Sequence, residues 1–419
     1  MINVKNNIPA IILSGGSEIV SLSLAEALVP YQVPLVVFSL GRSSLIRDIQ
    51  KGMVYRTIDW PPNSFESALA HLTSLLEEIG AGRPCPWPVF ATEDGGLRLL
   101  MEGRNRLSKY LSITGSPLLD MGGLDKAETF EFLAKNNRGD LIAPSFILKE
   151  FSQVPEAINQ LGQEIIFKPG LKPFSMQLET MDSKVVTPKP AENDSSLISR
   201  LSKAWPISKK WIAQIKLKTP EKGEAVWWGL RSKNGKIFGL TAYERWKQPR
   251  IGGTACWVEL EEIPELHEFA KKILTSLDFR GLVELPFLKD VQDQWRLLEI
   301  NPRPWLQVAL AARAGIPLVY AAYLDMLDSS LPDLPTRTDP KSWTNVERMI
   351  LAALSGEYGP KFKTLYKALS IIYKSDCKIV YDTSISKVRI RWLVRMTHNI
   401  FKKFTVALRS KILRFIDHC

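Results

Sequence analysis

The stretch Leu-Leu-Glu-Ile-Asn-Pro-Arg at residues 297–303 constrains this chain more than any other. Two leucines lead a short strand to Glu299, and Asn301 follows two residues later, so both side chains lie on one face of that strand. Both supply oxygen, and Mg²⁺ is usually held by one or two carboxylates together with substrate phosphates. Pro302 interrupts the strand pairing, and Arg303 adds a permanent cation. A bare Glu-x-Asn more often marks a buried strand that ends in a polar turn, and the same pair also suits a magnesium site.

Composition places the chain among ordinary globular proteins. It has 419 residues, enough for two to four packed units, with 45% hydrophobic and 24% charged residues. The four cysteines are far apart and the four histidines give no zinc-type spacing, so we expect reduced thiols in a cytoplasmic protein. The beginning of the sequence shows no signal-peptide pattern, and no apolar run is long enough to span a bilayer. We expect a chain that is neither secreted nor integral to a membrane.

Residues 1–121 alternate short apolar strands with helices. This pattern predicts an open, doubly wound α/β domain with a parallel sheet, whose strands we expect at 8–13, 33–38 and 88–91. Glu93 and Asp94 follow the last of these strands, at the carboxyl end where such sheets bind ligands. Equally, these two residues can cap the helix that follows them.

Residues 122–328 have a different pattern of expected helices and strands. Asp125 and Lys126 begin a helix, and a later apolar strand ends in Lys168. Burying a lysine is unfavourable unless an anion meets it, and a phosphate group would serve. A strand-rich region follows, with an Asn-Gly hairpin turn at 234–235 and two strands that precede Glu299.

Residues 329–342 have the composition of a linker, and 343–419 read as a basic helical extension. From Lys387 to the end, nine Lys or Arg face one acid, Asp417, with apolar residues interleaved. This basic amphipathic pattern fits docking on the protein or an oligomer contact, and it also fits peripheral contact with an anionic membrane through 385–419. No nucleic-acid motif accompanies the charge, so we expect no nucleic-acid partner.

With Lys126, Lys168, Glu299 and Asn301 in this order, residues 1–325 resemble the ATP-grasp superfamily, in particular its carboxylate–amine ligases and the ATP-binding fold of the carbamoyl phosphate synthetase large chain. The resemblance implies an α/β fold in four parts. These are a doubly wound pre-ATP-grasp domain (1–121), two α+β ATP-grasp subdomains (122–210 and 211–328), and the linker with its basic helical extension (329–419).

The resemblance also implies the ligands and their residues. ATP would be bound through Lys126 and Lys168, and Mg²⁺ through Glu299 and Asn301. In this reading Arg303 steadies the transferred phosphoryl group, and a basic stretch faces the acidic substrate with Arg245, Lys247 and Arg250.

Three positions depart from the family pattern. The loop after Lys168 has few glycines, so it offers fewer close backbone approaches to phosphates. The usual second metal ligand is replaced by Pro286, and Glu284 can substitute from roughly 7 Å along the strand. The family's Gln-Glu pair on the adenine side reads Gln214-Ile215 here, which leaves Gln214 on that side and Glu221 or Glu224 for the ribose hydroxyls.

The resemblance implies a Mg²⁺-dependent ligase. ATP would phosphorylate a small-molecule carboxylate to an acyl phosphate, which an amine or similar nucleophile attacks. The alternative is a degenerate ATP-grasp protein that serves as a nucleotide-binding or scaffold partner, including at a membrane surface. The three departures favour that alternative, and the intact lysines and metal ligands oppose it.

Overall fold

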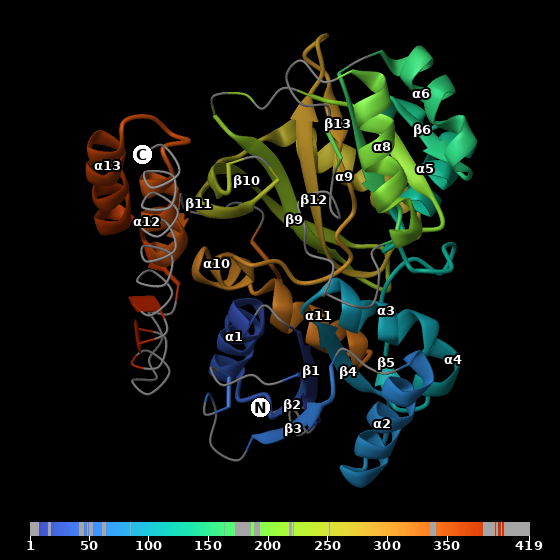
Figure 1. The fold of residues 1–419 in the computed structure, drawn as a ribbon. Coiled ribbons are helices and arrows are strands. Elements are labelled where there is room, and N and C mark those ends of the chain that lie inside the picture. Colours follow the sequence, from blue (N-terminus) through green and yellow to red (C-terminus); the bar gives the residue numbers. More distant parts are fainter. Residues whose placement is uncertain are drawn as a thin grey trace, which may run out of the picture.

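Three β-sheets organise the part of the chain that the computed structural model describes (Figure 1). The described residues are 8–15, 18–41, 46–47, 49, 53–60, 64–83, 85–162, 164–171, 186–187, 193–217, 220, 222–250, 252–335, 341–379, 390, 393–394 and 396–397. The predicted α/β class is confirmed, with a parallel sheet at the N-terminus and two largely antiparallel sheets after it.

The N-terminal sheet is parallel and has the order β3-β2-β1-β4-β5. Its strands are β1 (Ala10–Ser14), β2 (Leu35–Leu40), β3 (Val54–Ile58), β4 (Trp87–Ala91) and β5 (Leu111–Ser112). Its helices are α1 (Glu18–Leu28), α2 (Phe65–Glu78), α3 (Asp94–Glu102) and α4 (Arg104–Leu107). Strands β1, β2 and β4 are buried throughout, which is why their sequences are continuously apolar. The edge strand β3 is half exposed and carries a weaker pattern, and the sequence analysis did not predict it.

The second sheet is small and antiparallel, with the order β6-β8-β7. Its strands are β6 (Ser145–Leu148), β7 (Ile165–Pro169) and β8 (Trp211–Ile215). Helices α5 (Lys126–Lys135), α6 (Val154–Leu161) and α8 (Asp194–Ala204) belong to the same part of the chain. Because β8 is the central strand, residues 211–215 lie with this sheet, and the division expected between 210 and 211 falls inside it.

The third and largest sheet has the order β13-β12-β9-β10-β11-β14-β15. Its first five strands in sequence are β9 (Glu224–Arg231), β10 (Ile237–Gln248), β11 (Thr254–Leu260), β12 (Gly281–Lys289) and β13 (Trp295–Leu297). Alternate residues of β9 face opposite cores: Trp227 packs with α9 (Pro264–Ser276), and Trp228 packs with α10 (Val308–Arg313) and α11 (Leu318–Met326). The second of these cores also takes in α1, β1 and β2, so it joins the large sheet to the N-terminal domain.

The C-terminal part contains more than the expected helices. Helices α12 (Val346–Ser355) and α13 (Lys361–Lys374) pack beside β10 and β11, around Trp246 and Cys256. Two short strands, β14 (Ser342–Thr344) and β15 (Cys377–Lys378), extend the edge of the large sheet, which the sequence analysis did not predict. Of the 385–419 segment only five residues are described, so most of that prediction lies outside the described residues. No helix in the described ranges is long and apolar enough to cross a bilayer.

The indole of Trp227 occupies space that two glycines leave open. Gly229 on β9 and Gly239 on β10 are paired across the strands. A Cβ atom would lie 2.1 Å from the ring at Gly229 and 2.2 Å from it at Gly239. The indole is fully buried, and its Nε1 donates to Nδ1 of His267 at 3.1 Å. The indole can therefore lie over these two positions only because neither has a side chain.

Replacing Gly239 with alanine should therefore strain this core. Overpacking a well-packed core commonly lowers the free energy of unfolding by about 1–3 kcal/mol, and we expect a loss of that size. Urea or thermal unfolding followed by tryptophan fluorescence would measure it. Gly139→Ala is the matched control, because its nearest contact would be an ordinary 4.0 Å. Equal stability of the two variants would contradict the packing argument.

Candidate active site

The segment that follows β13 brings three oxygen-bearing side chains together. Strand β13 ends at Leu297, and the chain then returns so that Asn301 pairs with Glu284 of β12 through two backbone hydrogen bonds of 3.0 Å. The Asn301 amide donates to the carboxylates of Glu284 and Glu299, each at 3.2 Å. Pro286 offers no ligand, yet the pairing of Glu284 with Asn301 places the Glu284 carboxylate beside the other two groups.

The Glu284 carboxyl group lies in an acidic, desolvated environment. Burial, together with the nearby Glu244 carboxyl group, raises the pKa of Glu284 to about 7, while Arg303 acts in the opposite direction. One of its oxygens accepts a hydrogen bond of 2.9 Å from Nε1 of Trp228. Burial also raises the pKa of Glu244. Such an excess of carboxyl groups would be relieved by a bound cation.

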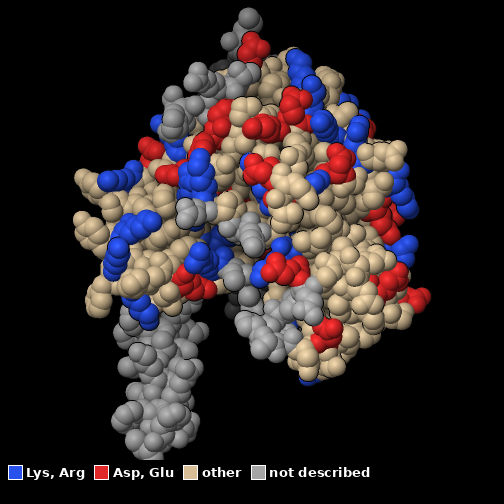
Figure 2. Space-filling model, turned by 90° about the horizontal axis from the view of Figure 1, so that it is seen from above, with Lys and Arg blue, Asp and Glu red and all other residues tan. Residues whose placement is uncertain are grey.

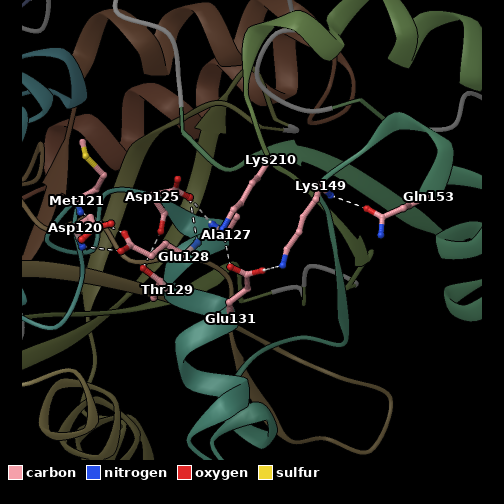
Figure 3. Close-up of polar contacts among 10 residues, drawn as sticks. All are labelled: Asp120, Met121, Asp125, Ala127, Glu128, Thr129, Glu131, Lys149, Gln153 and Lys210. Atoms are coloured by element: carbon pink, nitrogen blue, oxygen red, sulfur yellow. Dashed lines mark hydrogen bonds and ion pairs between the residues drawn. The ribbon is translucent and has the colours of Figure 1, made fainter.

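Lys126 reaches this group from the start of α5. Asp125 caps the helix by accepting from the backbone N–H groups of Ala127 and Glu128, at 2.9 and 3.2 Å (Figure 3). The backbone N–H of Lys126 donates to Gly170 at the end of β7, at 2.9 Å. Fixed in this way, the Lys126 ammonium group forms an ion pair with Glu299.

Lys168 comes from the neighbouring sheet and is held by an amide. Its Nζ donates to Oε1 of Gln214 at 2.9 Å, and the Gln214 amide in turn donates to Ser145 Oγ at 3.2 Å. Desolvation lowers the pKa of Lys168 to about 8, opposed by the Glu299 carboxylate and assisted by the Lys126 ammonium group. Because burial disfavours the charged form of Lys168, an anion bound beside it would stabilise the ammonium group.

Lys247 on β10 faces the same region between two carboxylates. Its Nζ lies 2.8 Å from Glu224 and 3.0 Å from Glu244. Burial alone would lower the pKa of Lys247, but the two carboxylates outweigh burial and raise it. In a regular strand, residues 244 and 247 would point to opposite faces. A β-bulge between them, at Trp246, brings both side chains to one side.

Arg303 links the site to the N-terminal domain. Its Nε donates to the Asp94 carboxylate at 2.7 Å, at the beginning of α3. Burial would lower the pKa of Arg303, but the Asp94 carboxylate raises it. A pocket opens here, between the N-terminal domain and the residues described above. Its lining includes Asp94, Gly95, Arg98, Lys126, Gly170 and Asn301.

Two other predicted residues, Arg245 and Arg250, lie apart from this group. Arg245 points to the other side of β10, where it contacts Glu259 at 2.8 Å and Glu261 at 3.1 Å. Arg250 donates to the backbone oxygen of Glu357, between α12 and α13. Glu221 lies outside the described residues.

Sequence reasoning did not identify Glu244 and Trp228 as site residues. For Asp94 it left two roles open, ligand binding and capping of the helix that follows. The signal for Glu244 was a carboxylate within a half-buried strand, which predicts a partner of opposite charge. Among the described residues, no group of three or more His, Cys, Asp or Glu has the arrangement of a metal-binding cluster. The candidate metal ligands therefore comprise two carboxylates and one amide.

Comparisons with known proteins agree with this architecture. No protein-family model and no curated protein matches the sequence. N5-carboxyaminoimidazole synthetase from Staphylococcus aureus has a similar solved structure (TM-score 0.56, 18% identity), and the match covers 84% of this chain and 85% of that one. A biotin carboxylase from Campylobacter jejuni, in a beta-gamma-ATP complex, matches at TM-score 0.61 and 12% identity, over 81% of this chain and 76% of that one.

A third match is the biotin carboxylase domain of 2-oxoglutarate carboxylase from Hydrogenobacter thermophilus, in complex with MgADP, ADP and bicarbonate. Its TM-score is 0.60 at 12% identity, and the match covers 80% of this chain and 74% of that chain. The three sheets thus define an α/β protein with the same architecture as these solved structures. The chain has an ATP-grasp fold, as its sequence predicted.

The raised pKa of Glu284 predicts a pH-dependent stability. Between the usual pKa of 4.5 and about 7, the folded protein keeps a proton that the unfolded chain releases, so this group makes stability fall as pH rises through that window. Glu284→Gln removes this effect. We expect the variant to gain stability relative to wild type from about pH 5 to pH 8, measured by thermal unfolding.

Glu268→Gln on the exposed side of α9 is the control for removing a carboxylate. A constant difference between Glu284→Gln and wild type across this range would show that Glu284 is not desolvated as described.

Proposed function

We propose that this protein is a Mg²⁺-dependent ligase that uses ATP to activate a carboxylate as an acyl phosphate for attack by an amine. One observation carries the proposal: Lys126, Lys168, Glu284, Glu299 and Asn301, far apart in sequence and from two sheets and a helix, converge on one region. The fold is that of solved structures that include complexes with beta-gamma-ATP and MgADP.

The two lysines suit the phosphates of ATP. ATP carries roughly four negative charges, and both phosphoryl transfer and binding require these charges to be offset. Lys168 is desolvated and held by a neutral amide, so a phosphate group would stabilise its ammonium form. Lys126 forms an ion pair with Glu299, and this pair would open as phosphate and metal take the two groups as separate partners. Gln214, which accepts a hydrogen bond from Lys168, is proposed for the adenine side of the nucleotide. Glu221 or Glu224 is proposed for the ribose hydroxyls.

The residues present fit Mg²⁺. Glu284, Glu299 and Asn301 offer oxygen atoms within one hydrogen-bonded group, and burial together with the Glu244 carboxyl group raises the pKa of Glu284, so a cation there would stabilise its ionised form. When bound, Mg²⁺ would offset phosphate charge during transfer.

The chain's own residues would position the reactants. A carboxylate oxygen of the substrate forms a bond to the γ-phosphorus of ATP, and the bond to the β-phosphate oxygen breaks to release ADP. The amine then attacks the acyl carbon, phosphate leaves and the amine loses a proton. Arg303, held by Asp94, and Lys247, held by two glutamates, present fixed cations to the anionic groups. Arg245 and Arg250, which the resemblance assigned to an acidic substrate, lie apart from these groups and take no part in the proposed steps.

A second function has its own support. Lys126 is paired with Glu299, and Lys247 with Glu224 and Glu244, so the lysines neutralise their neighbours within the chain itself. Such pairing, with the glycine-poor loop and Pro286, fits an ATP-grasp protein that binds a nucleotide without chemistry or acts as a scaffold. The two functions differ in whether ADP is released.

Calorimetric titration of MgATP tests the nucleotide site first. We expect binding by the wild type, and binding weakened about tenfold or more by Lys168→Met and Glu299→Gln, since a hydrogen bond to a charged group contributes about 1.5–3 kcal/mol. Lys210→Met is the matched control. Its Nζ pairs with Glu131 at 2.7 Å on the side of α5 seen in Figure 3, and the variant keeps its backbone contact with Gly170.

No binding by a folded wild-type protein would overturn the nucleotide site. Binding without ADP release, across a panel of carboxylates and amines, would favour the non-catalytic function. Amine-dependent ADP release that Lys168→Met abolishes would support the ligase.

The affinity for ATP should depend on pH through Lys168. Its ammonium form, which phosphate requires, is complete below a pKa of about 8 and is lost as pH rises through that value. We expect the affinity to fall by about tenfold per pH unit above pH 8, until the pKa of the bound state is reached. Titrations from about pH 7 to 9.5 measure the slope. Lys168→Arg keeps its charge across this range and should show a flat profile, so parallel profiles would contradict the assignment.

A further inference from the structure

One face of helix α13 exposes a row of large apolar side chains. Phe362 is 92% exposed, Tyr366 79%, Leu369 52% and Tyr373 85%. Their spacing of four, three and four residues places them in a single stripe along a helix of 14 residues, about 21 Å long. Of the eight exposed large hydrophobic residues in the described ranges, four belong to this helix. The stripe is therefore a feature of the helix rather than scattered surface residues.

The opposite face of α13 accounts for the folding of the helix. Thr364 and Ala368 are buried, and Ala368 packs with Met349 and Ala352 of α12 against Trp246 of β10. The helix thus has its core contact without the stripe. The exposed row is available for a partner outside this core.

The charge of the helix indicates what kind of partner fits. Its 14 residues include four lysines and no acid. Helical spacing places Lys363 and Lys374 along one flank of the stripe, and Lys361 begins the helix. The ammonium group of Lys367 lies over the ring of Trp246, 5.6 Å from its centroid. Figure 2 shows Lys and Arg side chains interspersed with other residues on the side of the molecule where α13 lies. An aromatic stripe flanked by lysines is the pattern of a helix that lies in the interface of an anionic bilayer.

A second copy of the chain fits less well. In a two-fold interface the same patch meets itself, and in an antiparallel pair of α13 helices the lysine flanks would lie side by side without an acid on either helix. An anionic surface meets both properties of the helix, because lipid headgroups pair with the lysines while the aromatic rings enter the interfacial layer.

We propose that α13 is a docking surface for an anionic lipid bilayer, with Phe362, Tyr366, Leu369 and Tyr373 inserted at the level of the headgroups. The sequence beyond residue 386 adds nine Lys or Arg against one acid, which would strengthen attraction to the same surface. This contact does not depend on catalysis. It goes beyond the proposed ligase by placing the enzyme at a membrane surface.

The docking surface is joined firmly to the candidate active site. Tyr358, in the turn that leads into α13, donates its hydroxyl to the backbone oxygen of Lys247 at 2.8 Å and accepts from the Lys247 backbone N–H at 2.8 Å. Its ring stacks on Trp246 with centroids 4.4 Å apart. A bilayer bound to α13 would thus hold the active site at a fixed orientation.

Vesicle flotation with the full-length chain tests the proposal. The vesicles contain either phosphatidylcholine alone or phosphatidylcholine mixed with phosphatidylglycerol. We expect binding to the anionic vesicles only, reduced about tenfold or more by Phe362→Ser combined with Tyr373→Ser. Lys363→Gln and Lys374→Gln should each reduce binding about fivefold, and added salt should reduce the binding of the wild type.

Val291→Ser is the matched control, because Val291 is also 92% exposed but lies in the turn between β12 and β13. It should bind like the wild type. All replaced residues are exposed, so the variants should fold, and thermal unfolding checks this. Unchanged vesicle binding by the stripe variant, or equal binding to neutral vesicles, would overturn the proposal. Sedimentation of a dimer that the stripe variant abolishes, without vesicle binding, would assign the stripe to a second copy and also overturn it.

Discussion

The balance of buried charge where the segment after β13 pairs with Glu284 of β12 governs the candidate active site. Three ammonium groups face four carboxyl groups there, apart from the paired Arg303 and Asp94. The groups are Lys126, Lys168, Lys247, Glu224, Glu244, Glu284 and Glu299. With every group ionised, the acids would exceed the bases by one, and desolvation makes that excess unfavourable. Both Glu244 and Glu284 respond with raised pKa values. A divalent cation would replace the protons, while the lysines stay available for phosphates.

The sequence was most informative where chemistry and local pattern coincide. Glu299, Asn301 and Lys168 each follow an apolar run, so the strands β13 and β7 could be predicted from the sequence. The roles proposed for these three side chains start from the same runs. The pairing of strands was less accessible, because it joins residues distant in sequence. Only the structure shows that β8 lies between β6 and β7. The short strands β14 and β15 are defined by pairing at a sheet edge and carry little pattern of their own.

The basic stretch on β10 shows why side-chain direction resists prediction from sequence. Arg245, Lys247 and Arg250 form a single cluster in the sequence, but they point to three environments in the structure. The bulge at Trp246 reverses the alternation that a regular strand would give. Without it, Lys247 would lie on the side of Arg245, away from Glu244. A one-residue irregularity, which leaves no clear mark in the sequence, therefore decides which cation enters the site.

That irregular strand is stabilised from the C-terminal part of the chain. A bulge leaves backbone groups without their usual partners in the neighbouring strand, and such groups need other hydrogen bonds when they are buried. The Tyr358 hydroxyl supplies both a donor and an acceptor to the backbone of Lys247, and its ring covers Trp246. On the other side of the site, Asp94 of the N-terminal domain holds Arg303. Three parts of the chain thus fix the cations of one site, so the C-terminal helices contribute to its geometry as well as to the surface of the molecule.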